Sequence, residues 1–222
     1  MAASITRSPD IPPSATDLRD AYNLQLQSAS GDPVSFGDLI LEKGEITTIV
    51  VFIRHFFCVY DQDYVRSVSH HLTDSVLQTT PAAAGGPIQL IIIGCGDPSL
   101  IVPYVSDTDA HFPVYSDPDG KVYEKLHMER TVANIMRPPV YTDVGFWRSM
   151  GMTLRQMVGR GWKGLRGGRW DQNGGEWVFR NGRCRFVHRM ESVSDHLTAG
   201  ELMRILERRG SGDEVALGKV ED

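Results

Sequence analysis

The hydrophobic positions of the first half of the chain form two nearly uninterrupted runs. Ile46–Ile53 and Ile88–Ile93 are almost wholly apolar and rich in β-branched residues, which is typical of strands buried on both faces. Between them, from Tyr60 to about Thr80, apolar residues recur at helical spacing before the chain breaks at TTPAAAGGP. A strand, a helix and a strand in this order predict a right-handed parallel βαβ unit.

The last third of the chain has a different pattern. Glu176–Arg180 and Arg183–Arg189 alternate between apolar and polar residues on either side of Asn-Gly, which predicts a β-hairpin. A helix is expected over Leu197–Arg209, with Ser194 or Asp195 as its cap. A parallel unit, then an antiparallel hairpin, then a helix is the order of a thioredoxin-like α/β fold, with a central mixed sheet and flanking helices.

Shorter elements complete this expectation. They are a strand at Tyr22–Gln27, a helix at Val34–Ile40, a helix from Pro98 to about Val105, a strand in FPVYSD, and helices at Lys121–His127 and Phe146–Val158. The 222 residues fit one domain, which we expect over residues 15–210. Proline and small polar residues predict a flexible N-terminal arm over residues 1–14, and we expect a flexible C-terminal tail over residues 211–222.

Composition adds limits on location and partners. Three cysteines, a small and odd number, argue against a disulfide scaffold. The N-terminus also lacks an apolar leader, so we expect a cytoplasmic protein. The apolar runs are too short to cross a bilayer, and we expect no membrane partner. Residues 148–189 hold ten Lys or Arg and two acidic residues, whereas the whole chain has a net charge of −5. We interpret this basic segment as a solvated loop and expect no nucleic-acid partner.

Cys58 is the sharpest candidate for chemistry. It lies where the first long strand passes into a helix, and open α/β sheets place ligands at the carboxyl ends of their strands. A thiol in the first turn of a helix is close to backbone N–H groups, which favour the thiolate, and Arg54 and His55 are placed to add to this effect. The alternative is a small apolar residue of the core.

Several segments resemble the AhpC/TSA antioxidant family, and more narrowly its peroxiredoxin-like branch, which includes prostamide/prostaglandin F synthase and many fungal proteins. They are VVFIRHFFCVYDQDYV, IIIGCGDPSLIVPY, FPVYSDPDGKVYEKLHM, DQNGGEWVF and RFVHRMESVSDHL, which occur in this order over roughly residues 20–209. The resemblance implies a thioredoxin sheet, a catalytic corner at Cys58, and a facing loop from Gln172 through Gly174 and Gly175. This loop would contact the substrate, and it has glycines where the family's fold usually has a cis-proline.

The chain departs from the family at one position. Members usually carry Cys-x-x-Cys at this corner, and here Asp61 replaces the second cysteine. No disulfide can form within the turn, and a carboxylate one turn away raises the pKa of a thiol. Cys95, at the end of the neighbouring strand, is the candidate to resolve a sulfenic acid on Cys58, and Cys184 is expected to pack in the hairpin.

Other residues suggest chemistry that needs no thiol. Arg54, His55, Tyr60 and Asp61 bring acid, base and hydrogen-bond donors into one corner. Trp147 and Met150, in a Met-rich segment, are candidates for the wall of an apolar pocket or for simple helix packing. We interpret His188 and His196 as structural. No spacing matches a zinc motif and no glycine-rich phosphate loop follows a strand, so no metal and no cofactor are expected.

Three hypotheses follow for function. The first is a peroxiredoxin-like oxidoreductase that acts on a peroxide or small organic substrate through Cys58, with a thiol as the reductant. The second keeps the fold but uses Asp61 with Tyr60, His55 or Arg54 for isomerisation, cyclisation or dehydration of a small molecule, such as a secondary metabolite. The third is a non-catalytic binding module.

Overall fold

The structure of the protein is a computed structural model, and it describes residues 10–41, 46–79, 87–132, 139, 142, 146–159 and 168–208. Seven strands form one sheet in the order β2-β1-β5-β4-β3-β6-β7. The strands are β1 (Gln25–Gln27), β2 (Pro33–Ser35), β3 (Thr47–Ile53), β4 (Ile88–Gly94), β5 (Val114–Ser116), β6 (Gly175–Arg180) and β7 (Arg183–Arg189).

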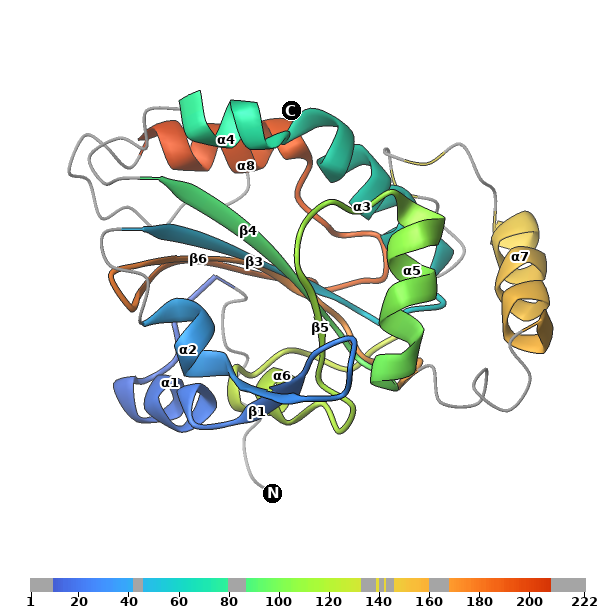
Figure 1. Cartoon of the computed structure of the whole chain (residues 1–222), viewed down its shortest axis with the longest axis horizontal. Helices are drawn as coiled ribbons and strands as arrows, with labels where there is room; N and C mark the ends of the chain where they lie inside the picture. Colours follow the sequence, from blue (N-terminus) through green and yellow to red (C-terminus); the bar gives the residue numbers. More distant parts are fainter. Residues whose placement is uncertain are drawn as a thin grey trace, which may run out of the picture.

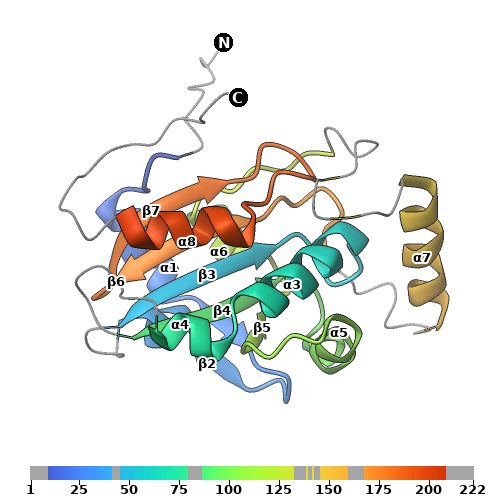
Figure 2. The same ribbon diagram turned by 90° about the horizontal axis from the view of Figure 1, so that it is seen from above.

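Helices cover both faces of this sheet (Figures 1 and 2). They are α1 (Ala15–Tyr22), α2 (Phe36–Ile40), α3 (Val59–His71), α4 (Asp74–Thr79), the 3-10 turn η1 (Pro98–Leu100), α5 (Ile101–Thr108), α6 (Lys121–Lys125), α7 (Phe146–Gly159) and α8 (Ala199–Arg208). Helices α3, α5 and α8 share one apolar core with one face of the sheet, and α1, α2 and α6 share a second core with the other face. Among the described helices, none has the length and apolar character needed to cross a membrane.

The central strands confirm the predicted topology. Strand β4 pairs in parallel with both β3 and β5, whereas β6 pairs antiparallel with β3 and with β7. All seven residues of β3 are buried, as its continuous hydrophobicity predicted. The parallel unit, the hairpin and the final helix therefore assemble into the expected mixed α/β sheet.

The N-terminal segment differs from the expectation. A helix that the sequence did not predict, α1, directly follows the expected arm and takes in Tyr22, so only Gln25–Gln27 of the expected strand is extended. Ser14 caps α1 by accepting a hydrogen bond from the Asp17 N–H at 3.1 Å. The Ile11 carbonyl accepts a hydrogen bond from Arg189 at 2.8 Å, so residues 10–14 contact the folded body. Residues 1–9 and 209–222 lie outside the described residues.

Three further elements differ from those that the sequence predicted. The long helix expected after Tyr60 is divided into α3 and α4, because Leu72 leaves the helical conformation and Thr73 starts a new turn. Helix α8 begins after Thr198, whose side chain exchanges hydrogen bonds with Glu201 in a capping box, so the predicted caps Ser194 and Asp195 are wrong. Strand β2, which pairs with β1, was not expected.

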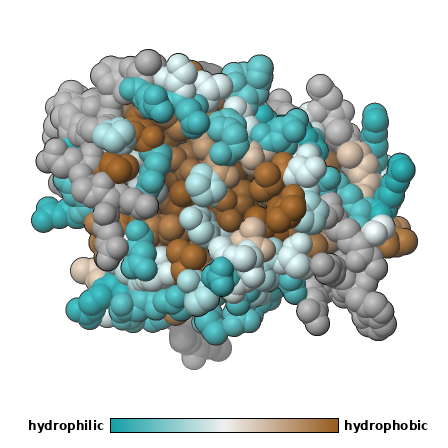
Figure 3. Space-filling model, in the orientation of Figure 1, coloured by the Kyte–Doolittle hydropathy of each residue, from teal (hydrophilic) through white to brown (hydrophobic). Residues whose placement is uncertain are grey.

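The surface facing the viewer of Figure 1 is apolar in its middle and polar around its rim (Figure 3). Helix α7 lies to one side of the layered body in both ribbon views. Its contacts with the body are made mainly through α3, whose first turn holds the candidate site.

Candidate functional site

Cys58 occupies the turn between β3 and α3, where the sequence predicted it. It is the N-cap residue of α3, with φ −71° and ψ 110°, and its N–H donates to the His55 carbonyl at 3.1 Å. The Cys58 side chain is nearly covered, with 6% of the residue exposed. The thiol therefore has the backbone position of a thioredoxin-fold nucleophile and the burial of a core residue.

The surroundings of the thiol favour its protonated form. Burial and, after it, the Asp61 carboxylate raise the pKa of Cys58 to about 12, whereas the Arg54 guanidinium acts in the opposite direction. The expectation that the helix N-terminus makes Cys58 a ready thiolate is therefore wrong for the resting protein. Desolvation and a neighbouring anion outweigh the helix dipole because the site is almost closed to water.

Arg54 links this corner to the facing loop. One terminal nitrogen, Nη1, lies 3.4 Å from the Cys58 sulfur. The other nitrogens donate to two carbonyls of the loop, that of Gln172 at 3.1 Å and that of Trp170 at 2.6 Å. Arg54 is 3% exposed, so its charge acts on the thiol with little screening by solvent.

The facing loop contributes backbone rather than side chains. The Gln172 amide points to the carbonyls of Glu129 and Asn173, so Gln172 reaches the site only through its own carbonyl. Gly174 and Gly175 lie against β3 and β7, where a Cβ on Gly174 would be 1.8 Å from the Phe52 carbonyl oxygen. The glycines thus permit a close approach of the loop to the sheet, and no cis peptide occurs in the described residues.

Asp61 is fully buried beside the thiol. One carboxylate oxygen accepts a hydrogen bond from the backbone N–H of Arg54 at 2.6 Å, and the other lies 3.4 Å from His196 Nε2. Burial opposes ionisation, but the hydrogen bond and the charge of His196, together with Arg54, hold the pKa of Asp61 below its usual value. Asp61 is therefore an anion, which suits a base or the partner of a cation and excludes a resting general acid.

His55 and Tyr60 have smaller roles than the sequence suggested. Burial and the neighbouring Arg54 lower the pKa of His55 to about 3, so this imidazole is neutral and does not help to stabilise a thiolate. Its ring packs on Trp170 with 4.8 Å between the centroids. Tyr60 is buried in a small cluster with Cys58 and Val193, and this burial raises its pKa.

Helix α7 contacts the corner through Thr153 and Gln156, and not through the expected Trp147 and Met150. Thr153 donates to the Phe57 carbonyl at 3.1 Å, and the amides of Gln156 and Gln62 pair at 3.0 Å. Trp147 is 77% exposed and Met150 is 42% exposed. The expectation that Trp147 and Met150 wall an apolar pocket is therefore wrong in this structure, because the helix is rotated so that they face solvent.

Cys95 lies in the opposite layer from Cys58. It packs with Ile91, Ile93 and Phe52 in the core beneath α1, α2 and α6, whereas α3 lies over the other face of the sheet. Burial, with the nearby Asp117, raises the pKa of the Cys95 thiol to about 12. The structure thus gives no support to Cys95 as a resolving cysteine, and Cys58, Cys95 and Cys184 are all in the reduced thiol form.

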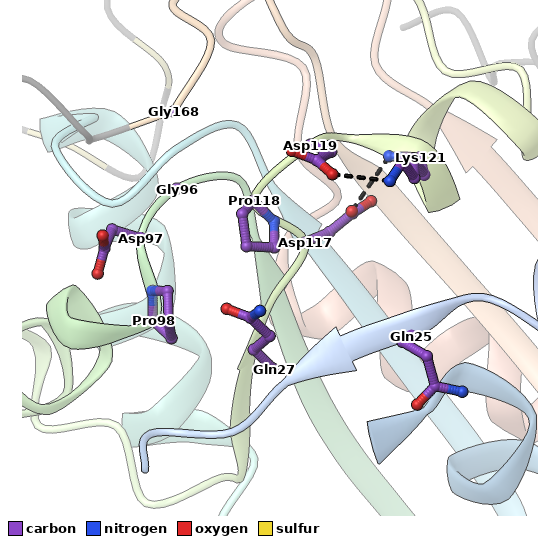
Figure 4. Close-up of a pocket in the computed structure, with 10 residues that line it drawn as sticks. All are labelled: Gln25, Gln27, Gly96, Asp97, Pro98, Asp117, Pro118, Asp119, Lys121 and Gly168. Atoms are coloured by element: carbon purple, nitrogen blue, oxygen red, sulfur yellow. Dashed lines mark hydrogen bonds and ion pairs between the residues drawn. The ribbon is translucent and has the colours of Figure 1, made fainter. Parts of the chain in front are cut away.

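A pocket of about 630 Å³ opens beside the loops that follow β4 and β5 (Figure 4). Its walls include Gln27, Asp97 and Asp119, and none of the predicted site residues lines it. The carboxylates there are already engaged, since Asp97 caps η1 and Asp119 pairs with Lys121 at 2.8 Å. The pocket is separate from the corner that holds Cys58.

The largest feature missed from the sequence is a group of buried histidines behind Asp61. Glu176 on β6 lies 2.8 Å from His188 Nδ1 and 2.5 Å from His196 Nδ1. Glu176 and His196 show no exposed side-chain surface, and His188 little. A signal was present in the sequence, because the acidic Glu176 directly precedes the apolar run Trp177–Phe179 in a predicted strand.

Charge pairing explains how these groups tolerate burial. Despite desolvation, Glu176 raises the pKa of His196 to about 9 and also raises that of His188, while the two imidazoles lower the pKa of Glu176 to about 2. Among the described residues, no three His, Cys, Asp or Glu side chains are grouped as a metal site requires.

Comparisons with known proteins place this geometry in context. A family model described as AhpC/TSA antioxidant enzyme matches residues 72–192, more than half of the chain. Peroxiredoxin-like 2C of Homo sapiens is 26% identical over 92% of this chain and 87% of its own length. Peroxiredoxin-like 2C of Bos taurus is 26% identical over 82% of this chain and 76% of its own length.

Two solved structures show the same fold at low identity. The bacterioferritin comigratory protein of Xanthomonas campestris, described with alkyl peroxide reduction activity, has a TM-score of 0.54 and 7% identity, and the match covers 87% of this chain and 96% of that one. Reduced Prx3 of Vibrio vulnificus in complex with hydrogen peroxide has a TM-score of 0.54 and 14% identity, and the match covers 90% of this chain and 99% of that one. These likenesses confirm the thioredoxin-like architecture.

Proposed function

This chain belongs to the AhpC/TSA antioxidant enzyme family, and from this premise we propose that it reduces a peroxide, hydrogen peroxide or that of a small organic molecule, through the thiol of Cys58. The observation that carries the proposal is the contact between Arg54 and the Cys58 sulfur, at 3.4 Å in the first turn of α3. A guanidinium at this distance stabilises the thiolate that must form for attack. It also leaves a fixed cation beside the oxygen at which negative charge develops.

The chemistry proceeds in two stages. The Cys58 thiolate attacks one peroxide oxygen, the O–O bond breaks, and the sulfur is oxidised to a sulfenic acid while the leaving oxygen takes a proton and departs as an alcohol or as water. An external thiol then displaces water from the sulfenic acid and forms a mixed disulfide. A second external thiol releases Cys58 and carries away the disulfide. The reductant must come from outside because Asp61 occupies the second cysteine position of the family's Cys-x-x-Cys, so no disulfide can form within the turn.

The resting thiol makes this a slow reaction at neutral pH. With a pKa of about 12, Cys58 reacts through a small thiolate fraction, and that fraction grows with pH. We therefore expect a rate of peroxide reduction that rises steadily between pH 6 and pH 9.

Chemical trapping of oxidised Cys58 tests the role of the thiol directly. Hydrogen peroxide added to the reduced protein is expected to convert Cys58 to a sulfenic acid that a dimedone-type probe traps, and Cys58→Ser is expected to abolish the labelled peptide in mass spectrometry. Cys184→Ser, which alters a half-buried thiol in the hairpin, is the matched control and should leave the signal intact. Labelling that appears only after the protein is unfolded would refute the proposal.

Acid–base chemistry is the second candidate, and one observation favours it. Asp61 is an ionised carboxylate with His196 Nε2 at 3.4 Å behind it, which resembles the arrangement of a general base. Against it, Asp61 has no exposed surface, so a substrate proton would have to reach it through Cys58 or Tyr60.

Paired substitutions separate the two functions. In an assay of peroxide consumption with a small thiol as the reductant, Cys58→Ser is expected to lose activity to background, while Asp61→Asn retains it. Loss of turnover of a small organic substrate in Asp61→Asn, with normal turnover in Cys58→Ser, would establish the acid–base function instead. Full activity in both variants would leave only a binding role.

A further inference from the structure

A row of five ionisable side chains runs from the Cys58 corner toward the surface, and we call it the carboxylate–imidazole chain. In order, it consists of Asp61 on α3, His196 in the segment before α8, Glu176 on β6, His188 on β7, and Asp195. The successive distances are 3.4 Å, 2.5 Å, 2.8 Å and 3.8 Å. Acids and histidines alternate along the whole row.

The inner members are held rigidly and the outer end reaches water. Asp61, His196 and Glu176 have no exposed side-chain surface, whereas His188 is 9% and Asp195 is 24% exposed. The Tyr64 ring stacks on His196 with 4.1 Å between centroids and 6° between planes, which fixes the imidazole between Asp61 and Glu176. The arrangement therefore has one defined geometry from the protein surface to the residue beside the thiol.

We propose that His196, held in place by Glu176 and His188, is a positioning residue that controls the reactivity of Cys58 through Asp61. The inference deepens the proposed function, because it takes Cys58 as the reactive group. It assigns a role to residues that the peroxide chemistry itself does not use.

The stability of a thiolate at Cys58 depends on the charges around it. A thiolate forming at Cys58 faces the Asp61 anion, the Arg54 cation and the hydroxyls of Tyr60 and Tyr104. The neutral His55 lies near Asp61 on the same side. His196 faces Asp61 and Glu176, and His188 faces Glu176, Asp195 and Asp10. A protonated His196 compensates the Asp61 anion, so the thiolate is less disfavoured than it would be beside an uncompensated buried carboxylate. Glu176 keeps His196 protonated and oriented, and His188 holds the other oxygen of the Glu176 carboxylate.

A purely structural role for the chain makes a different prediction. If the buried pairs only hold β6, β7 and α3 together, their loss would lower stability without changing the pH dependence of Cys58. The reactivity of Cys58 at several pH values therefore distinguishes the two roles.

The test measures the rate at which iodoacetamide alkylates Cys58 in the folded, full-length protein, with the Cys58 peptide quantified by mass spectrometry. In the wild type, the logarithm of the rate is expected to rise with pH and to bend downward near pH 9, where His196 loses its proton. His196→Asn should be slower at pH 8 by about tenfold, the equivalent of one pKa unit, and should lack the bend. His70→Asn, an exposed histidine on α3, is the control and should match the wild type.

A double-mutant cycle shows whether the effect passes through Asp61. Asp61→Asn removes the anion and should raise the rate by about tenfold. Adding His196→Asn to Asp61→Asn should change the rate by less than about twofold, because no carboxylate remains for the histidine to compensate. A wild-type rate and profile in His196→Asn, or an equal effect of His196→Asn in both backgrounds, would overturn the inference.

Glu176→Gln keeps the test decisive if His196→Asn does not fold. It removes the anion that raises the pKa of His196, so alkylation at pH 8 should slow by about threefold in a protein with a native circular-dichroism spectrum. An unchanged rate in that folded variant would overturn the inference. If the substitutions change the alkylation rate as expected but peroxide does not oxidise Cys58, the proposed function is refuted and the inference about His196 stands.

Discussion

Replacing Glu176 with alanine is expected to lower the free energy of unfolding by on the order of 3–5 kcal/mol, measured by urea denaturation at pH 6. The substitution removes the anion shared by His188 and His196 at the centre of the molecule and leaves two imidazoles without their acceptor. Breaking a buried ion pair by removing one partner costs more than the pair itself contributes, because the remaining charge stays desolvated. Glu176→Gln keeps the volume and one acceptor and should cost less.

The pH dependence of stability identifies the same residues. The pKa of Glu176 falls from 4.5 to about 2 on folding, so its contribution is present above pH 4.5 and is lost as the pH falls toward 2. The pKa of His196 rises from 6.5 to about 9, so its contribution is present below pH 6.5 and is lost as the pH rises toward 9. The wild type should therefore be most stable between about pH 5 and pH 6, and Glu176→Ala should show a flatter profile.

Glu207→Ala is the matched control for this prediction. Glu207 is an exposed residue of α8, and its loss should change the free energy of unfolding by less than about 0.5 kcal/mol. A similar loss in both variants, or a wild-type pH profile in Glu176→Ala, would mean that the buried pairs contribute nothing specific.

Replacing Gly174 with alanine is expected to have the second large effect, a loss on the order of 3 kcal/mol or a failure to fold. The new Cβ would lie 1.8 Å from the Phe52 carbonyl oxygen, where β6 begins to pair with β3. The backbone must move apart there, and this movement displaces the loop whose carbonyls at Trp170 and Gln172 hold Arg54. We therefore expect the rate of Cys58 alkylation to change along with the stability.

Gly151→Ala separates this steric effect from a general effect of alanine. Gly151 lies on the exposed side of α7 with nothing within 4 Å of its added Cβ. Alanine there should stabilise the protein by about 0.5–1 kcal/mol, since glycine is the weaker helix former. Equal thermal midpoints for wild type and Gly174→Ala would contradict the close approach of the facing loop.

Local sequence patterns were sufficient for the central elements. The continuous hydrophobicity of β3 and β4, the Asn-Gly turn between β6 and β7, and the handedness rule for parallel units together predicted the middle of the sheet. The position of Cys58 followed from the same information, because a residue between a buried strand and an amphipathic helix must lie at the carboxyl end of the sheet.

Register was decided by tertiary structure. Counting outward from the Asn-Gly turn, an unbroken hairpin places Glu176 opposite Val187. A bulge between Val178 and Phe179 shifts the pairing by one residue and puts Glu176 opposite His188, which makes the buried ion pair possible. Such a bulge depends on packing against both faces of the sheet, and the alternation of residues does not reveal it.

Solvent exclusion at the site was likewise beyond the sequence. The residues near Cys58 indicated a helix N-terminus that favours a thiolate, yet closure by α7 and the facing loop buries the thiol and Asp61 together. The ionisation of a buried group depends on charges brought from distant parts of the chain, here His196 and Glu176. The sequence by itself thus determined which residues meet at the corner, and the tertiary structure decided their protonation, because that depends on burial and on partners far apart in the chain.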